Sequence, residues 1–364
     1  MSNLLDAIDR QIGEVRTESL DLSFGEIVNL HKANELVIQP EYQRLFRWSQ
    51  EQRSRLVESI LLELPIPPIF LIENDNGVLE LIDGLQRTSS VIQFIEASQI
   101  NLDPLVLDGC DLINELNTKK FLDLPMTLRM RIKRSAVRAI IIKRQSKPFL
   151  KYEMFKRLNT GGALLSPQEI RNCSSRMVGD IGVDFYSFLQ QCASKPFFKR
   201  SIIRLPEEDF EKRQDEELVL RFFALINGID LFKGSVRDWL DDYMEKVLKG
   251  DMPFDYKNNE VIFDELFSFI DKCFSNGAFS RYSTSRDPVG RLAPAYFEAV
   301  AVGVYEAIQS NITVALQKAN DINEVIITTV LSEPFKAVTG PGANTQTKLR
   351  ERILLIREAV TGVL

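Results

Sequence analysis

The sequence predicts an α+β chain with two domains, a small mixed domain at residues 1–175 and an all-α helical domain at residues 176–364. Two short apolar runs at 69–73 and 78–82 flank an Asn-Asp-Asn-Gly turn, which indicates a β-hairpin. A β-branched run at 136–143 predicts a third strand. From about residue 176 onward, apolar residues recur with helical spacing. A chain of 364 residues has room for two domains.

The other elements of the first domain are predicted from local signals. Residues 1–35 have apolar residues at helical spacing, which predicts a helical lead-in. Ser49, followed three residues later by Gln52, predicts a capping box with an amphipathic helix behind it. A further helix is expected to begin near Leu85, directly after a strand, and residues 98–125 are expected to be loop-rich.

Helices are also predicted for the end of the first domain and throughout the second. Phe149–Leu158 has helical spacing and is followed by Asn-Thr-Gly-Gly. The next helix begins with an N-cap serine at Ser166, a proline at the first helical position and a capping-box glutamate at Glu169. Later segments with apolar faces of period 3.6 are DFEKRQDEELVLRFFALI, SVRDWLDDYMEKVLKG, IFDELFSFIDKCF, RLAPAYFEAVAVGVYEAI and TKLRERILLIREAV.

Composition excludes several classes of protein. Hydrophobic residues make up 45% and charged residues 26%, close to the globular average, so disorder and fibrous repeats are excluded. Mean hydropathy is −0.09 and no run of about 20 apolar residues occurs, so no membrane span is expected. The first 15 residues lack the apolar core of a secretory signal. Four widely spaced cysteines without a CxxC motif fit a cytoplasmic protein.

The number of histidines argues against sites that need several imidazoles. The chain has one histidine, His31. An HNH nuclease, a His-based zinc site or a two-histidine phosphodiesterase needs more imidazoles. His31 is expected to lie at a helix end. Acid–base work would then fall to carboxylates, and phosphate positioning to Arg and Lys.

Basic residues are concentrated in one segment of an acidic chain. The net charge is −6, but residues 129–157 hold eleven Lys or Arg and one acid, which gives +10 there and −16 elsewhere. Such a run is either a solvated face or a surface for polyphosphate or nucleic acid. The candidate nucleic-acid contacts are Arg129, Arg131, Lys133 and Arg134 in this segment, and Arg281 and Arg286 (directly before Asp287) in the later loop RYSTSRDPVGR.

The strongest candidate site is the turn Asp83-Gly84-Leu85-Gln86-Arg87-Thr88 between a predicted strand and a predicted helix. A glycine there lets the backbone approach a ligand closely, and the free N–H groups of a helix's first turn favour an anion. Arg87 and the Thr88 hydroxyl add donors. The alternative interpretation is a structural turn with a surface arginine.

Two other segments are candidates for ligand contacts. Tyr42, Gln43 and Arg44 offer a ring for a base or sugar, and an amide and a guanidinium for phosphate. The alternative there is an extended segment whose aromatic residues pack in the core. Asn159, followed by paired glycines, is either a ligand contact or a left-handed helix end.

The order of these motifs resembles a known family. The sequence reads Pro-x-Tyr-Gln-Arg-x-x-x-Trp at 40–48, Ser-Ile-Leu-x-x-x-Pro-Ile-Pro-x-Ile at 59–69, Asp-Gly-x-Gln-Arg at 83–87, and Phe-x-Arg-Leu-Asn-x-Gly-Gly-x-x-Leu-Ser-x-x-Glu-Ile-Arg at 155–171. Over roughly residues 20–175 it is similar to the N-terminal domain of GmrSD-type modification-dependent restriction endonucleases. The resemblance continues weakly in RQDEELVLRFFAL and in Phe-x-x-x-Thr-Gly-x-x-x-Asn at 335–344.

The resemblance implies a fold like that of ParB and sulfiredoxin, in which a Gly-x-x-Arg turn binds nucleotide phosphates. It also implies a link to NTP hydrolysis through the family's DGQQR motif, and to sensing of modified phage DNA. Asp83, Gln86 and Arg87 are then the expected catalytic residues, and Asp83 is the expected Mg²⁺ contact. The other expected contacts to the NTP are Tyr42, Gln43, Arg44, Gly84, Thr88 and Asn159.

Two departures from the family change what is expected of this chain. Leu85 stands where the family has the first glutamine of Asp-Gly-Gln-Gln-Arg. Longer members of the family carry a His-rich HNH-like nuclease domain. This sequence has one histidine, His31, and cannot supply such a domain. The chain is therefore expected to be a stand-alone member, with DNA cutting left to a separate nuclease subunit.

The leading hypothesis is an NTP-binding and NTP-hydrolysing, Mg²⁺-dependent component of a bacterial anti-phage or modification-dependent restriction system. Its expected partners are a nucleoside triphosphate, DNA, a separate nuclease and further copies of the chain, with no membrane. The alternative is a non-catalytic DNA-binding sensor or adaptor that works with a separate nuclease. Direct nuclease activity has the least support, because no two-metal carboxylate cluster is visible.

Overall fold

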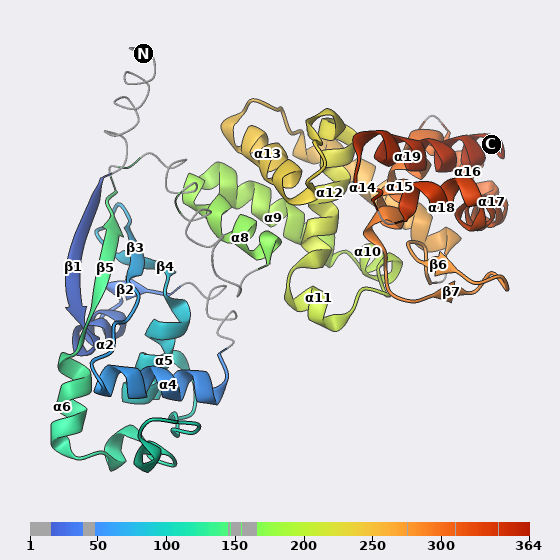
Figure 1. Cartoon of the computed structure of the whole chain (residues 1–364). Coiled ribbons are helices and arrows are strands. Elements are labelled where there is room, and N and C mark those ends of the chain that lie inside the picture. Colours follow the sequence, from blue (N-terminus) through green and yellow to red (C-terminus); the bar gives the residue numbers. More distant parts are fainter. Residues whose placement is uncertain are drawn as a thin grey trace, which may run out of the picture. The chain divides into compact units, whose positions relative to one another are not determined.

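The computed structural model describes residues 16–38, 48–144, 146, 154, 166–274, 276–309, 311–340 and 342–364. The chain divides into two compact units, Met1–Ala163 and Leu164–Leu364 (Figure 1). The first combines a sheet with helices and the second is mostly helical, so the predicted α+β class is confirmed. The helix predicted at Phe149–Leu158 lies outside the described residues, apart from Met154.

The first unit is built on a five-stranded mixed sheet in the order β1-β5-β3-β4-β2. The strands are β1 (Thr17–Ser23), β2 (Leu36–Val37), β3 (Ile69–Glu73), β4 (Leu79–Asp83) and β5 (Ala136–Ile142). Neighbours β1/β5 and β3/β4 are antiparallel, whereas β5/β3 and β4/β2 are parallel. The predicted hairpin is β3–β4 and the predicted third strand is β5, so both are confirmed.

The helical lead-in expected for residues 1–35 is wrong at residues 17–23, which form β1. This strand pairs with β5 along its whole length, from Thr17 opposite Ile142 to Ser23 opposite Ala136. Arg138 and Asp21, 117 positions apart in sequence, form an ion pair across the two strands at 3.1 Å. Local apolar spacing carries no signal for a partner so distant in the chain.

The described part of the first unit has four helices, which lie toward the lower end of the sheet in Figure 1. They are α2 (Phe24–Lys32), α4 (Gln50–Leu61), α5 (Leu85–Glu96) and α6 (Met126–Arg134). The Ser49–Gln52 capping box begins α4 as predicted, and His31 lies in the last turn of α2. Three short 3-10 turns occur in the predicted loop region, at Ala97–Ile100, Asn114–Leu116 and Phe121–Asp123.

Buried apolar side chains from both layers form the core of this unit. Leu71 from β3, Val57 from α4 and Ile92 from α5 are completely buried. The buried carboxylate of Glu58 fixes the loop over α4, because its Oε1 accepts from the backbone N–H groups of Leu112 and Ile113 at 2.9 and 2.7 Å. The strands and helices next to the β4–α5 turn are thus closely packed.

The second unit is helical, as predicted, with one exception. Its helices are α8 (Pro167–Ser175), α9 (Asp180–Ser194), α10 (Pro196–Ser201), α11 (Glu207–Glu211), α12 (Gln214–Gly228), α13 (Val236–Lys249), α14 (Tyr256–Cys273), α15 (Pro294–Ile308), α16 (Ile312–Gln317), α17 (Ala319–Leu331), α18 (Glu333–Thr339) and α19 (Gln346–Thr361). The exception is a small hairpin of β6 (Arg281–Tyr282) and β7 (Pro288–Val289). Phe198, Phe222, Phe223, Phe263 and Phe267 form an aromatic cluster in its core.

Candidate functional site

The turn between β4 and α5 depends on a glycine. Gly84 is the N-cap of α5 and has φ of 100°, in the left-handed region that glycine adopts without steric cost. A Cβ at this position would lie 2.5 Å from Cγ2 of Ile69, so the strand β3 leaves no room for one. No side-chain cap satisfies the first turn of α5. Backbone N–H groups at this helix end therefore remain suited to an anion.

Arg87 lies beside this turn, and one nitrogen of its guanidinium group is hydrogen-bonded. Its Nη2 donates to the Pro68 carbonyl at 3.0 Å and to Oδ2 of Asp83 at 3.2 Å. The side chains of Arg87 and Asp83 are 19% and 33% exposed. The buried Nε of Arg87 has no hydrogen-bond partner in the described part of the chain. A guanidinium has five donors, so this arrangement leaves capacity for an oxyanion.

The residues on either side of Arg87 are buried. Oε1 of Gln86 accepts from the backbone N–H of Trp48 at 3.0 Å, which ties the start of α4 to the first turn of α5. Thr88 is 1% exposed, and its hydroxyl has no partner among the residues that the structure describes. Gln86 thus has a structural role through its hydrogen bond to Trp48. Its action on phosphates or water stays a prediction.

Arg53, which sequence reasoning missed, holds the two helices of the site together. Its Nη1 donates to Oε1 of Gln93 on α5 at 2.8 Å, and its Nε donates to the Ser49 carbonyl at 3.2 Å. Gln93 in turn donates to the Asp103 carbonyl at 2.9 Å. Burial lowers the pKa of the Arg53 guanidinium. No sequence motif marks this residue, because its partner Gln93 is 40 positions away.

The residues at the turn fit a metal ion only in company with a phosphate ligand. Within the described ranges, no group of three or more His, Cys, Asp or Glu is placed to hold a metal. Asp83 offers one carboxylate, of which Oδ2 is already paired with Arg87. Mg²⁺ is commonly bound through one or two carboxylates together with substrate phosphates. Asp83 matches that kind of site and not an all-protein cage.

The four basic residues predicted on α6 differ in their contacts. Nη1 of Arg131 donates to the Leu61 carbonyl at the end of α4 at 3.3 Å, and Lys133 lies 5.8 Å from the ring centroid of Phe121. Arg129 and Arg134 have no ion-pair partner among the described residues. Arg131 and Arg134 also line a cavity of about 390 Å³. None of the four cations on this helix forms an ion pair with another described residue, because the contacts of Arg131 and Lys133 are to a carbonyl and to an aromatic ring.

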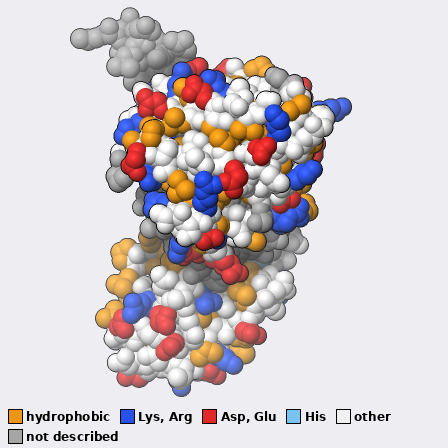
Figure 2. All heavy atoms as spheres, turned by 90° about the vertical axis from the view of Figure 1, so that its right-hand side faces the viewer, with side chains coloured by type: hydrophobic (Ala, Val, Ile, Leu, Met, Phe, Trp, Pro, Cys, Tyr) orange, Lys and Arg blue, Asp and Glu red, His pale blue; other side chains and the backbone are white. Residues whose placement is uncertain are grey.

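Some of the other basic residues in the 129–157 segment and in the loop after β6 are ion-paired within their own unit. Lys143 contacts Glu73 at 3.2 Å, which lowers the pKa of that carboxyl. In the loop after β6, Arg286 pairs with Glu324 of α17, while Arg281 is exposed. Figure 2 shows one face on which acidic, basic and apolar side chains alternate without a large basic patch. The α6 residues and this loop belong to different units.

The last part of the Asn159-to-Arg171 motif enters the helical unit. Ser166 and Glu169 form the predicted capping box at the start of α8. The Ser166 hydroxyl donates to the Lys212 carbonyl at 2.6 Å, just before α12. Asn159 itself, like Tyr42, Gln43 and Arg44, lies outside the described residues.

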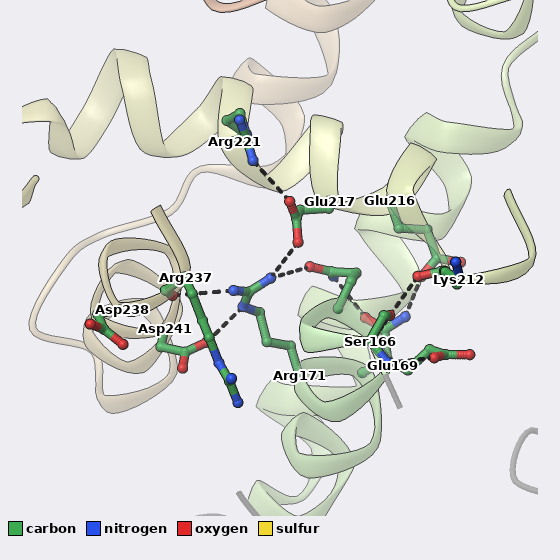
Figure 3. Close-up of polar contacts among 12 residues, drawn as sticks. Ser166, Glu169, Arg171, Lys212, Glu216, Glu217, Arg221, Arg237, Asp238 and Asp241 are labelled. Carbon is green, nitrogen blue, oxygen red and sulfur yellow. Dashed lines mark hydrogen bonds and ion pairs between the residues drawn. The ribbon is translucent and has the colours of Figure 1, made fainter. Parts of the chain in front are cut away.

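Arg171 of α8 is 1% exposed and is surrounded by acceptors (Figure 3). Its Nη1 donates to Oε2 of Glu217 on α12 at 3.0 Å, and its Nε donates to Oδ1 of Asp241 on α13 at 2.7 Å. Nη2 donates to the Arg237 carbonyl at 3.2 Å. The arginine therefore joins three helices at a single buried point.

A line of alternating buried charges continues from Arg171 across the helical unit. Glu217 also pairs with Arg221 of its own helix at 2.9 Å, and Arg221 pairs with Glu298 of α15 at 2.8 Å. Glu298 pairs in turn with Arg352 of α19. We call this line, from Asp241 through Arg171, Glu217, Arg221 and Glu298 to Arg352, the charge ladder. Its three guanidinium groups and three carboxylates balance.

Two adjacent buried acids on α12 have pKa values that are shifted in opposite directions. Burial raises the pKa of Glu216, whose main partners are the amides of Asn172 and Gln190 and the half-exposed Arg213. Burial also acts to raise the pKa of Glu217, but the charges of Arg221 and Arg171 outweigh it, so its pKa is lowered. The ladder thus keeps Glu217 ionised.

The small mixed sheet, the glycine–arginine turn and the helical second unit define an α+β protein with a candidate anion site. Among protein-family models, that of the GmrSD restriction endonuclease N-terminal domain matches residues 24–175. Residues 24–175 are therefore similar to that N-terminal domain, which confirms the predicted resemblance. Comparisons with curated proteins and with solved structures give no match. No described helix is long and apolar enough to cross a membrane.

Replacing Gly84 by alanine should destabilise the first unit. The substitution forces a side chain into the left-handed region and against Ile69, at a combined cost of about 2–4 kcal/mol in the free energy of unfolding. Gly77→Ala is the matched control, because Gly77 has φ of 79° with nothing within 4 Å of a Cβ. Urea unfolding of both variants measures the difference, and equal losses would contradict the packing argument.

Glu217→Gln and Glu216→Gln should affect stability differently at neutral pH. Glu217→Gln leaves Arg171 and Arg221 short of a carboxylate in the interior, at a cost of about 3–5 kcal/mol. Glu216→Gln removes a charge that burial disfavours and should change stability by less than about 1 kcal/mol.

The pH dependence gives a second readout of the same pair. A lowered folded-state pKa means that Glu217 stabilises the fold above its unfolded value of 4.5 and loses that contribution as pH falls through the folded-state value. Urea unfolding at pH 7 and below pH 4 should show the Glu217→Gln deficit shrinking in acid. A deficit that is constant with pH would refute the assignment.

Proposed function

We propose that this chain binds a nucleoside triphosphate at the β4–α5 turn and hydrolyses it as a component of a modification-dependent restriction system. The observation that carries the proposal is the buried, unpartnered Nε of Arg87 beside the left-handed Gly84. A guanidinium with spare donors, next to an uncapped helix start, suits phosphate oxygens. Similarity of residues 24–175 to the GmrSD N-terminal domain supports the same biological setting. A ParB/sulfiredoxin-like fold of the first unit is part of the proposal.

Each residue at the turn then has a distinct role. Arg87 holds phosphate, and Gly84 lets phosphate approach the backbone. A phosphate at Arg87 competes with Asp83 for the guanidinium, which leaves the Asp83 carboxylate available to the Mg²⁺ that accompanies a nucleotide. Gln86, fixed by Trp48, lies next to these groups in the first turn of α5. Tyr42, Gln43, Arg44 and Asn159 remain the expected further contacts.

Arg87→Ala should weaken nucleotide binding strongly. Loss of a charged, partly buried phosphate contact is expected to weaken binding about 100-fold. Calorimetric titration with ATP, GTP, CTP and UTP in the presence of Mg²⁺ measures the affinity, and phosphate release measures turnover. Arg138→Ala is the matched control, because Arg138 is an exposed, ion-paired arginine on β5 of the same unit. Equal affinities for the two variants, or no binding by the wild type, would overturn the proposal.

DNA binding through α6, as a sensor or adaptor without turnover, is the second candidate function. It is favoured by Arg129 and Arg134, which lack ion-pair partners among the described residues, in contrast to the paired Arg286. Restriction systems act on DNA, and a separate nuclease subunit would then do the cutting. Further copies of this chain are a proposed partner in either function.

Salt dependence tests this candidate. Each phosphate contact contributes about 0.9 to the slope of log affinity against log salt, so the double variant Arg129→Ala/Arg134→Ala should lower that slope by about 1.8. Arg286→Ala should leave it unchanged, because that arginine is neutralised by Glu324. Fluorescence anisotropy on duplex DNA at several salt concentrations measures the slope. A flat salt response of the wild type would rule out phosphate-driven binding.

A further inference from the structure

We propose that three exposed apolar side chains at the start of helix α6 insert between base pairs when the first unit binds DNA. They are Leu122, Pro125 and Met126, which we call the apolar tip. Leu122 and Met126 are 77% and 61% exposed, and Pro125 is exposed as well. The inference rests on the second candidate function, DNA binding through α6, and adds to it the feature of DNA that is recognised. It does not depend on nucleotide binding at the β4–α5 turn.

The apolar tip is presented by a turn that is fixed to the core of the first unit. Phe121, directly before Leu122, is buried, and its ring meets that of Phe94 on α5 edge-on at 5.6 Å between centroids. Leu124, two residues further on, is buried too. The Pro125 carbonyl accepts from two backbone N–H groups in the first turn of α6, at 3.0 and 3.1 Å. Because its neighbours are held in place, Leu122 stays on the surface, where it contributes little to folding.

Positive charge precedes and follows the apolar tip. Residues 119–134 hold six Lys or Arg and one acid, Asp123, which gives a net charge of +5. None of these six cations forms an ion pair with a residue that the structure describes. The Asp123 carboxylate accepts from the backbone N–H of Lys120 at 2.8 Å. Lys133, in the last turn of α6, lies 5.8 Å from the ring centroid of Phe121, so cations from the end of the helix also lie near this turn.

An apolar centre among unneutralised cations fits DNA better than it fits a protein partner. Lysine is depleted from protein–protein interfaces, whereas Lys and Arg are the residues that contact DNA phosphates. Leu, Met and Pro are among the side chains that insert between base steps, and the cations beside them then bind the phosphates on either side. Insertion has to unstack the bases, and that cost is smallest where pairing is already weakened. The expected ligand is therefore duplex DNA that contains a weakly stacked step.

Leu112 provides a contrast within the same unit. It is 69% exposed, and its backbone N–H is held by the buried Glu58 carboxylate at 2.9 Å. Its sequence neighbour is an acid, Asp111, which pairs with Arg55 at 2.8 Å. Leu112 is thus as exposed as the apolar tip but lies next to a neutralised pair of charges. It is not expected to meet DNA, which makes it the matched control.

The double variant Leu122→Ala/Met126→Ala and the control Leu112→Ala are compared with the wild type in the full chain. Fluorescence anisotropy at several salt concentrations measures the Kd for a fully paired duplex and for the same duplex with one mismatched pair. The wild type and Leu112→Ala should bind the mismatched duplex about tenfold more tightly than the paired one. The double variant should bind both duplexes equally, with the salt slope of the wild type, because it loses no phosphate contact. All three proteins should have similar melting temperatures, since the substituted side chains are exposed.

A mismatch preference that the double variant retains, or that a DNA-binding wild type lacks, would overturn the inference and leave DNA binding through α6 standing. Loss of the preference in Leu112→Ala as well would also overturn it. Self-association that is lost only in the double variant, with an unchanged mismatch preference, would assign the apolar tip to a contact between copies of the chain instead. A wild type without salt-dependent DNA binding would overturn the second candidate function together with this inference.

Discussion

A full positive charge on Arg171, at 1% exposure, constrains how α8, α12 and α13 of the helical unit pack together. Taking a guanidinium out of water costs several kcal/mol, so carboxylates from α12 and α13 have to lie beside it. Glu217, once buried there, also takes Arg221, and the sequence of pairs continues to Arg352 on α19. The aromatic core supplies most of the burial, but the charge ladder specifies how five helices are aligned.

Two buried charged groups of the first unit differ in how far their hydrogen bonds are satisfied. Glu58 is buried, and its Oε1 accepts hydrogen bonds from two backbone N–H groups of the loop over α4. Arg87 is held by Asp83 and Pro68 yet keeps a buried donor without a partner. Folding alone explains the first arrangement. Under the proposed function the second arrangement is a phosphate site. The left-handed glycine beside Arg87 distinguishes this turn from helix α6, where the Nε of Arg129 is also buried without a partner among the described residues.

Local signals in the sequence predicted the elements whose causes are local. The β3–β4 hairpin, the capping boxes at Ser49 and Ser166 and the start of α5 each depend on residues within a few positions. Strand β1 could not be predicted in this way, since its register is set by β5, and its charged residues read equally well as a helix face. The β6–β7 hairpin was missed for a different reason, because each of its strands is only 2 residues long and too short to give an alternating pattern.

The candidate site, like the fold, was predictable from the sequence only where its features are local. The Gly84–Arg87 spacing pointed to the turn, but the close contact with Ile69 and the bond between Gln86 and Trp48 come from tertiary packing. Arg171 appeared in the sequence only as the end of a motif, because its partners lie 46 and 70 positions away. Since the turn itself is fixed by Ile69, Trp48 and Arg53, it has little freedom to adjust.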